Sequence, residues 1–263
     1  MHINLFQHEG KTLTDTDFEQ CFQTLGINEG DTVWVHSDLM AFGSVASNTK
    51  PKMLLNALLQ TLKRSIGDDG TLIMPTFTYS FTRNEVFDVQ KSPSKVGDLT
   101  EFFRRSQGVE RSHHPLFSVA SWGKHQTQFL DTNANAFDTN RSAFAALRHQ
   151  KGKILMLGAK FFDHCTFFHH LEFAADVPYR YLKDFGGMVK NDDDLQATTA
   201  SYYVRNLEIN PYIDGSRLKK HLIEQKMFNQ IQLGNATVEL IGAEDLFREG
   251  MVKLKENPYF LVR

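Results

Sequence analysis

Two adjacent histidines, His169 and His170, lie in the apolar stretch CTFFHHLEFAADVPYR, and Glu172 follows them. If this stretch is helical, residues three apart share a face, so His169 lies beside Glu172 while His170 is turned away by about 100°. A position in the first helical turn favours the neutral ring of His169, whereas Glu172 favours the charged ring. Opposed effects of this kind suit a general base, and the spacing therefore indicates acid–base chemistry at His169 and Glu172.

Other interpretations of the same segment remain open. The histidines could be hydrogen-bonded core residues, which is the common role of a histidine in an apolar helix. Cys165 and His169 are one helical turn apart and could carry out covalent acyl transfer. A zinc site would use His164, Cys165, His169 and His170. Their spacing matches neither Cys-x-x-Cys nor His-Glu-x-x-His, so we expect no metal.

The elements that must position these residues alternate between strands and helices. Ranges 31–37, 71–77, 151–159, 198–209 and 236–242 have strand composition, and ranges 14–27, 49–66, 96–106, 216–228 and 243–257 have helical spacing of apolar residues. The segment after Thr166 should be a helix that ends near Val177, because Pro178 follows. This order predicts an α/β/α layered domain around a mixed sheet, with room for a small appended C-terminal lobe.

Composition limits the partners. The chain has 263 residues, 29 basic and 31 acidic side chains, and two cysteines. A net charge of −2 offers no basic surface for nucleic acid or membranes, so we expect small-molecule ligands. We expect a cytoplasmic protein with one domain over residues 1–263, able to form a homo-oligomer, because no targeting segment or linker is evident. Patterns for nucleotide phosphates, dinucleotides and serine hydrolases are missing from the sequence.

Seven blocks, in order, resemble the aminoglycoside 3-N-acetyltransferase family. They are VHSDLMAFG, GTLIMPTFT, SPSKVGDLTEFFRR, RSHHPLFSVASWG, GKILMLGA, TFFHHLEFAADVPYR and NPYFL, between Asp31 and Leu261. The resemblance implies an α/β enzyme that moves an acyl group from acetyl-CoA or another acyl-CoA directly onto a sugar amine. His169 matches the family histidine that assists amine deprotonation, and Glu172 matches its acidic companion. His170 stands where the family usually has leucine.

The resemblance also implies which residues contact the two substrates. On the acyl-CoA side it points to Ser37, Asp38, Leu39, Phe42, Gly43, Thr76 and Ser118. Many relatives have serine where this chain has Asp38. On the acceptor side we expect His114, Tyr179 and Arg180 in the cleft, and Arg83, with Lys91 and Lys95, near a diphosphate.

The acceptor is predicted from charge. Aminoglycosides carry several positive charges and favour an acidic cleft, whereas this chain is close to neutral. The sequence therefore favours a nucleotide-linked amino sugar of surface polysaccharide synthesis, with antibiotic acetylation as the alternative. A non-catalytic ligand-binding member of the family is a second alternative, against which the retained His169 and Glu172 argue.

Overall fold

The computed structural model describes residues 2–130 and 133–263. The strands are β1 Asn4–His8, β2 Lys11–Thr14, β3 Thr32–Ser37, β4 Ser44–Val45, β5 Thr71–Pro75, β6 Phe87–Asp88, β7 Glu110–Arg111, β8 Val119–Gly123, β9 Lys153–Leu157, β10 Arg180–Asn191, β11 Asp194–Arg205, β12 Phe228–Leu233 and β13 Ala236–Gly242. The α-helices are α1 Asp15–Leu25, α2 Pro51–Ile66, α3 Asp98–Arg104, α4 Ala143–His149, α5 Phe161–His164, α6 Phe167–Ala174, α7 Ser216–Glu224 and α8 Ala243–Glu256. Short 3-10 helices span Leu39–Phe42, Ser80–Arg83 and Gln126–Phe129.

Local signals set the helix ends. Thr14 and Asp17 form a reciprocal capping box at the start of α1, and Gly26 ends that helix with a φ of 99°. Pro51 is the first residue of α2, where its missing amide costs nothing. These boundaries confirm the predicted helices.

Seven strands form the main sheet, in the order β12-β13-β9-β3-β5-β8-β7. The central strands β9, β3 and β5 run parallel, and the outer pairings are antiparallel. The predicted mixed sheet is therefore confirmed. The C-terminal strands β12 and β13 join this sheet and do not form an appended lobe.

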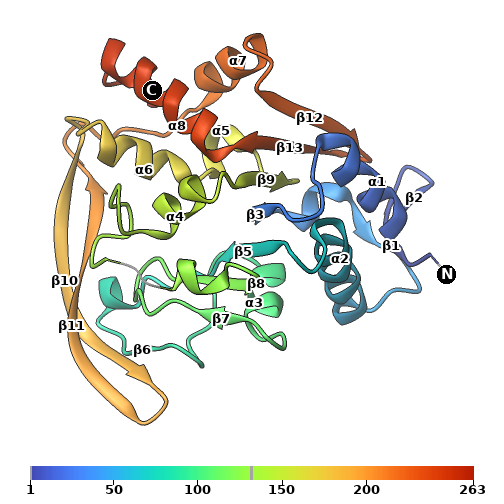
Figure 1. Ribbon diagram of the computed structural model, residues 1–263, viewed down its shortest axis with the longest axis horizontal. Helices are drawn as coiled ribbons and strands as arrows, with labels where there is room; N and C mark the ends of the chain where they lie inside the picture. Colours follow the sequence, from blue (N-terminus) through green and yellow to red (C-terminus); the bar gives the residue numbers. More distant parts are fainter. Residues whose placement is uncertain (1, 131–132) are drawn as a thin grey trace.

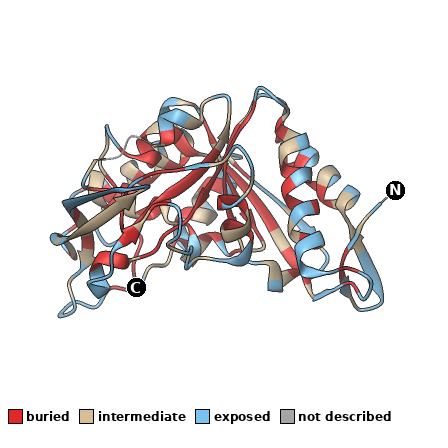
Figure 2. Ribbon diagram, turned by 90° about the horizontal axis from the view of Figure 1, so that it is seen from below, coloured by how far each residue is buried: buried red, intermediate tan, exposed pale blue. Residues whose placement is uncertain are grey.

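Alternate residues of the central strands face two separate cores, which gives three layers (Figures 1 and 2). Val33 and Val35 of β3 pack with helices α1, α2 and α3, whereas Trp34 packs with the core that holds helices α4, α6, α7 and α8. All five residues of β5 are buried, as expected for a strand that is covered on both faces. The predicted α/β/α layering is confirmed.

Strands β10 and β11 form a long hairpin beside the main sheet (Figure 1). Their 12-residue register runs from Arg180 opposite Arg205 to Asn191 opposite Asp194, and β6 pairs with β10. Much of the hairpin surface is exposed, including the side chains of Tyr181 and Leu182. One of its side chains reaches the end of helix α6: the hydroxyl of Tyr203 donates a hydrogen bond to the carbonyl of Val177, just after that helix.

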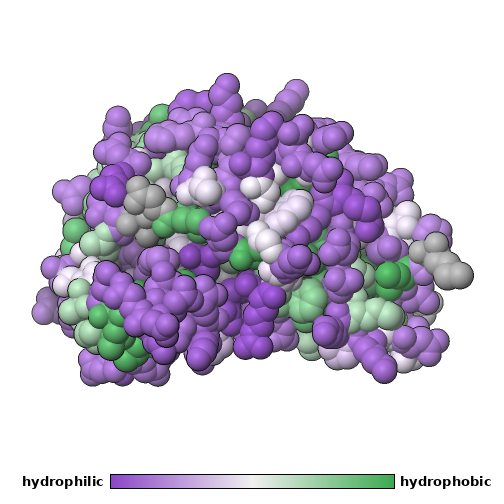
Figure 3. All heavy atoms as spheres, turned by 60° about the horizontal axis from the view of Figure 1, so that its bottom comes forward, coloured by the Kyte–Doolittle hydropathy of each residue, from purple (hydrophilic) through white to green (hydrophobic). Residues whose placement is uncertain are grey.

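The face of the molecule in Figure 3 is mostly hydrophilic, with small separate apolar areas. Within the described ranges, no helix has the length and apolar character needed to cross a membrane.

Candidate active site

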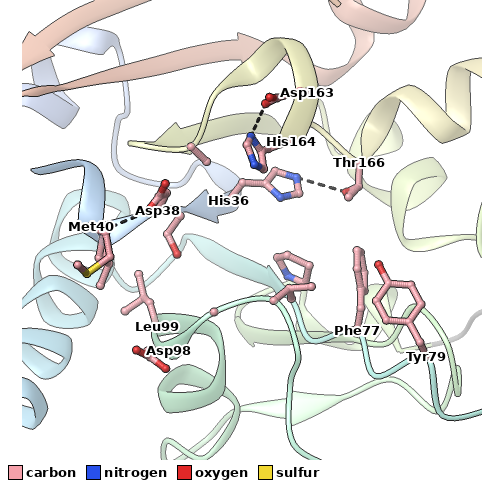
Figure 4. A pocket seen from close by; sticks show the side chains of 16 residues that line it. His36, Asp38, Met40, Phe77, Tyr79, Asp98, Leu99, Asp163, His164 and Thr166 are labelled. Atoms are coloured by element: carbon pink, nitrogen blue, oxygen red, sulfur yellow. Dashed lines mark hydrogen bonds and ion pairs between the residues drawn. The ribbon is translucent and has the colours of Figure 1, made fainter. Parts of the chain in front are cut away.

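A pocket of about 560 Å³ opens at the carboxyl ends of β9, β3 and β5 (Figure 4). Ligand sites of open α/β sheets commonly lie at this edge, because the loops after parallel strands meet there. The loop after β3 contributes Ser37 to Met40, and the segment after β5 contributes Phe77 and Tyr79. We call this cavity the first pocket. It is also lined by His36, Pro75, Val96, Gly97, Asp98, Leu99, Ala159, Asp163, His164 and Thr166.

The loop after β3 is held in place by its own backbone. The Asp38 amide donates to the Leu157 carbonyl on β9, and the Asp38 side chain accepts from the Met40 amide. Gly158 follows β9 with a φ of 75°, and a Cβ there would lie 2.4 Å from the Asp38 carbonyl oxygen. A residue without a side chain is thus required for the close approach of these two loops.

Two residues assigned to acyl-CoA binding in this loop do not line the pocket. Phe42 is fully buried, and its ring packs against Phe6 and Phe18. Gly43 has a φ of 115°, and an added Cβ would lie 2.5 Å from the Gln7 carbonyl oxygen. Both residues therefore join the loop to the N-terminal strands, and neither lines the first pocket.

Thr76 and Ser118 are also fully buried and bind each other and Arg111 instead of facing the pocket. Arg111 donates further hydrogen bonds to the carbonyls of Thr76, Val89 and Ser92. Burial, with a smaller contribution from the nearby Arg104, lowers the pKa of Arg111 to about 9. Neither hydroxyl lines the first pocket, and both solvate a buried guanidinium.

His169 and Glu172 meet as their spacing predicts. The Nδ1 atom of His169 lies 2.7 Å from Oε2 of Glu172, and the histidine side chain is 21% exposed. Because a carboxylate can only accept, Nδ1 donates, and Nε2 of the neutral ring keeps its lone pair. The ring also packs edge-on against Phe137. The hydrogen bond and the ring contact thus fix the orientation of the His169 ring.

Glu172 is fully buried and is shared by two partners. The Nε atom of Arg180 lies 2.7 Å from the same Oε2 that binds His169. Burial alone would raise the pKa of Glu172, but the hydrogen bond from His169 and the charges of His169 and Arg180 outweigh it, and this pKa lies below its usual value. Glu172 is thus ionised and can stabilise a protonated His169.

His170 has a different environment. It is fully buried among the rings of Phe144, Phe167 and Phe247, and Nδ1 donates to the Phe137 carbonyl. Burial lowers the pKa of His170 to about 4. The geometry therefore favours His169 as the base.

Cys165 is 3% exposed, and burial raises the pKa of its thiol to about 12. A buried thiol of this kind is a poor nucleophile. Among the described residues, no group of three or more His, Cys, Asp or Glu side chains is placed to hold a metal ion.

A second pocket of about 500 Å³ lies on the side of His169 that faces the hairpin. It is lined by His169, Arg180, Tyr181, Lys183, Phe185, Tyr202, Val204, Arg205 and Leu207. Tyr79 of the first pocket and Tyr202 of the second have ring centroids 6.5 Å apart. His169 lines the second pocket, and Thr166, three residues earlier in the chain, lines the first.

Of the other acceptor-side candidates, only Arg180 lines the second pocket. Tyr179 is fully buried, and burial, followed by the charge of Glu172, raises its pKa. The ring of His114 is 3% exposed and accepts from the amides of Leu116 and Phe117. These two residues support the site without facing its pockets.

Arg83 is paired with Glu85 and lines neither pocket, and Lys91 and Lys95 are exposed elsewhere. Their expected contact with a diphosphate therefore does not fit the geometry.

The sequence reasoning missed several residues of the site. His36, the residue before the last of β3, lines the first pocket and accepts from Trp34 Nε1. Burial, with a smaller contribution from His164, lowers the pKa of His36 to about 3. A polar residue at the carboxyl end of a parallel strand was an available signal. Tyr79 has a φ of 55°, which is uncommon for a non-glycine residue. Lys183 and Arg205 enter the second pocket only through the hairpin fold.

A carboxylate-bound histidine that lines a pocket of an α/β fold has an arrangement suited to general-base chemistry. A sequence model of the aminoglycoside 3-N-acetyltransferase family matches residues 34–255. The chain belongs to this family, and it is an N-acyltransferase that uses acetyl-CoA as co-substrate.

Known proteins agree with this assignment. The chain is 27% identical over 258 residues to aminoglycoside N(3)-acetyltransferase III of Pseudomonas aeruginosa, covering 89% of this chain and 91% of that protein. It is 26% identical over 199 residues to the aminoglycoside N(3')-acetyltransferase-like protein YokD of Bacillus subtilis, covering 67% and 70%. The solved complex of AAC-IIIb with CoASH superposes with a TM-score of 0.77 at 22% identity, covering 93% and 97% of the two chains, which supports the fold.

Proposed function

We propose that this enzyme transfers the acetyl group of acetyl-CoA directly to the primary amine of an amino sugar, with His169 as the general base. The observation that supports this proposal is the position of His169. Its ring is bound to Glu172, and the residue lines the second pocket. The amine must reach this ring, so the acceptor occupies the second pocket. The thioester then enters from the first pocket, whose lining includes Ser37, Asp38 and Leu39, three of the residues that the family resemblance assigns to acyl-CoA.

The residues act in a simple order. A sugar ammonium first loses one proton to solvent, because only the neutral amine can attack. Nε2 of His169 then takes a second proton from the nitrogen as this nitrogen bonds to the thioester carbonyl carbon. Glu172 stabilises the imidazolium that forms. When the carbon–sulfur bond breaks, the imidazolium can return the proton to the leaving thiolate of coenzyme A. No covalent bond to the protein is needed.

Two acceptor classes deserve comparison. The names of the relatives favour an aminoglycoside, which was our alternative prediction. The comparisons lend no support to a nucleotide-linked amino sugar. One feature of the structure favours an acceptor of that anionic kind: the second pocket is lined by Arg180, Lys183 and Arg205.

The test is thiol release from acetyl-CoA with aminoglycosides and amino sugars as acceptors, together with the mass of the product. We expect amine-dependent release, an acetylated amine, and initial-rate patterns that indicate a ternary complex. If no amine in either panel raised thiol release above the rate of hydrolysis, the proposed function would be wrong.

A further inference from the structure

The charge of the second pocket is unusual for an amine site. Three of its lining side chains are cationic, Arg180, Lys183 and Arg205, and no lining residue is a carboxylate. A site that binds a polycation gains affinity from acidic side chains, and cationic walls oppose it. The lining therefore points to an acceptor that carries negative charge as well as its amine.

Only one of the three cations is neutralised by the protein. Arg180 is buried against Glu172, with 6% of its side chain exposed. Lys183 and Arg205 are exposed and form no ion pair with a described residue, and Lys183 lies over the ring of Phe185. Arg205 also lies opposite Arg180 in the hairpin register, where two like charges destabilise each other. Lys183 and Arg205 are thus two cations available to a ligand.

The reaction places positive charge next to these cations without changing the net charge of the site. When His169 takes a proton from the amine, its imidazolium shares the single carboxylate of Glu172 with Arg180. A second ammonium group on the acceptor would be repelled by Lys183 and Arg205, whereas a phosphate group would be attracted.

We infer that the acceptor is a phosphate-bearing amino sugar whose amine lies at His169 and whose phosphate is bound by Lys183 and Arg205. This inference rests on the proposed function, because it takes the second pocket as the acceptor site. A phosphate ester or a diphosphate carries about two negative charges, which match two cations better than the single charge of a carboxylate does. The rings of Tyr181 and Tyr202 in the same pocket provide apolar faces for a sugar or a base.

The experiment compares acceptors that share one amine. Glucosamine, glucosamine 1-phosphate, glucosamine 6-phosphate and uridine-diphosphate glucosamine are assayed with acetyl-CoA, and their binding is measured by calorimetry without acetyl-CoA. We expect at least one phosphorylated acceptor to exceed glucosamine in kcat/KM by about tenfold or more. Lys183→Glu combined with Arg205→Glu should remove this preference and the binding, and leave the KM for acetyl-CoA unchanged. Lys190→Glu, on the same strand but outside the pocket, is the matched control.

Three results would overturn the inference. One is an unphosphorylated aminoglycoside that is acetylated faster than every phosphorylated sugar and is unaffected by the double variant. Another is a double variant whose KM rises for acetyl-CoA alone, which would place the phosphates of coenzyme A in this pocket. The third is that the phosphorylated sugars bind the double variant as tightly as they bind the natural enzyme. All three leave the proposed reaction intact, since that reaction fails only when no amine is acetylated. The second would in addition reassign the second pocket from the acceptor to acetyl-CoA.

Discussion

At the residue scale, the structure separates two neighbouring histidines by what each ring contacts. His169 shares Oε2 of Glu172 with Arg180 and lines the second pocket. His170 is enclosed by phenylalanine rings. Of the two histidines on this helix, we therefore propose His169 for the chemistry, and His170 serves packing.

Glu172→Gln tests how the carboxylate supports the base. An amide can still accept from Nδ1 of His169 but cannot stabilise the imidazolium, so we expect kcat to fall by about 10- to 10²-fold. Arg180 also loses its buried anion, so the melting temperature should fall. Glu249→Gln is a matched control, because Glu249 binds His221 at 2.8 Å outside both pockets. A kcat for Glu172→Gln equal to that of Glu249→Gln would show that the charge is unimportant.

Cys165→Ser tests whether the reaction passes through an acyl-enzyme. The thiol is buried with a raised pKa, so we expect turnover to change by a few-fold at most. Intact-protein mass spectrometry of the enzyme with acetyl-CoA alone should show no acetyl adduct. An adduct on Cys165 that disappears when the acceptor is added would contradict direct transfer.

At the element scale, the site depends on the exits of three parallel strands and on the hairpin. The first pocket requires the loops after β3 and β9 to approach closely, which Gly158 allows. The second pocket requires β10 and β11 to bring Lys183 and Tyr202 beside helix α6. The two pockets are thus formed by different elements, so a substitution can perturb one pocket without the other.

Gly158→Ala should damage the first pocket selectively. The new Cβ would lie 2.4 Å from the Asp38 carbonyl oxygen, so the loop Ser37–Met40 must move. We expect a KM for acetyl-CoA raised about tenfold or more, with a smaller change for the acceptor. Gly10→Ala is the control for backbone strain alone, because Gly10 has a φ of 77° and no atom within 4 Å of an added Cβ. Equal effects of the two substitutions would exclude the steric explanation.

At the scale of the whole molecule, three buried histidines make stability depend on pH. Burial lowers the pKa of His36 to about 3, and those of His114 and His170 to about 4, from an unfolded value of about 6.5. Between pH 6.5 and 4 the unfolded chain binds protons that the folded rings exclude. Folded stability from these groups is therefore complete above pH 6.5 and is lost as the pH falls toward 4.

The free energy of unfolding, measured with urea at pH 7 and at pH 4.5, should show this loss in the natural protein. His170→Leu removes one of the three groups, so the difference between the two pH values should shrink. At pH 7 the variant should be destabilised by about 1–3 kcal/mol, because the Phe137 carbonyl loses its donor. An unchanged pH difference would mean that His170 does not resist protonation.

The sequence predicted what is local. Helix α1 is set by its cap, strand β3 by its buried run, and the pairing of His169 with Glu172 by helical spacing. The features that the sequence did not predict depend on contacts between residues that are far apart in the chain. Thr76 and Ser118 lie in family blocks, but their hydroxyls are used by Arg111, whose partners come from several loops. Strand β10 contains adjacent glycines, Gly186 and Gly187, and is recognised only through its register with β11.

The most direct test of the account is the steady-state kinetics of His169→Ala, beside the control His221→Ala. His221 is also bound to a glutamate and is 20% exposed, but it lies outside both pockets. We expect kcat of His169→Ala to fall by about 10² to 10⁴-fold at pH 7 with an unchanged KM for acetyl-CoA, and to recover in part at high pH, where more of the amine is neutral. A kcat for His169→Ala within a few-fold of that of His221→Ala would contradict the assignment of His169 as the base.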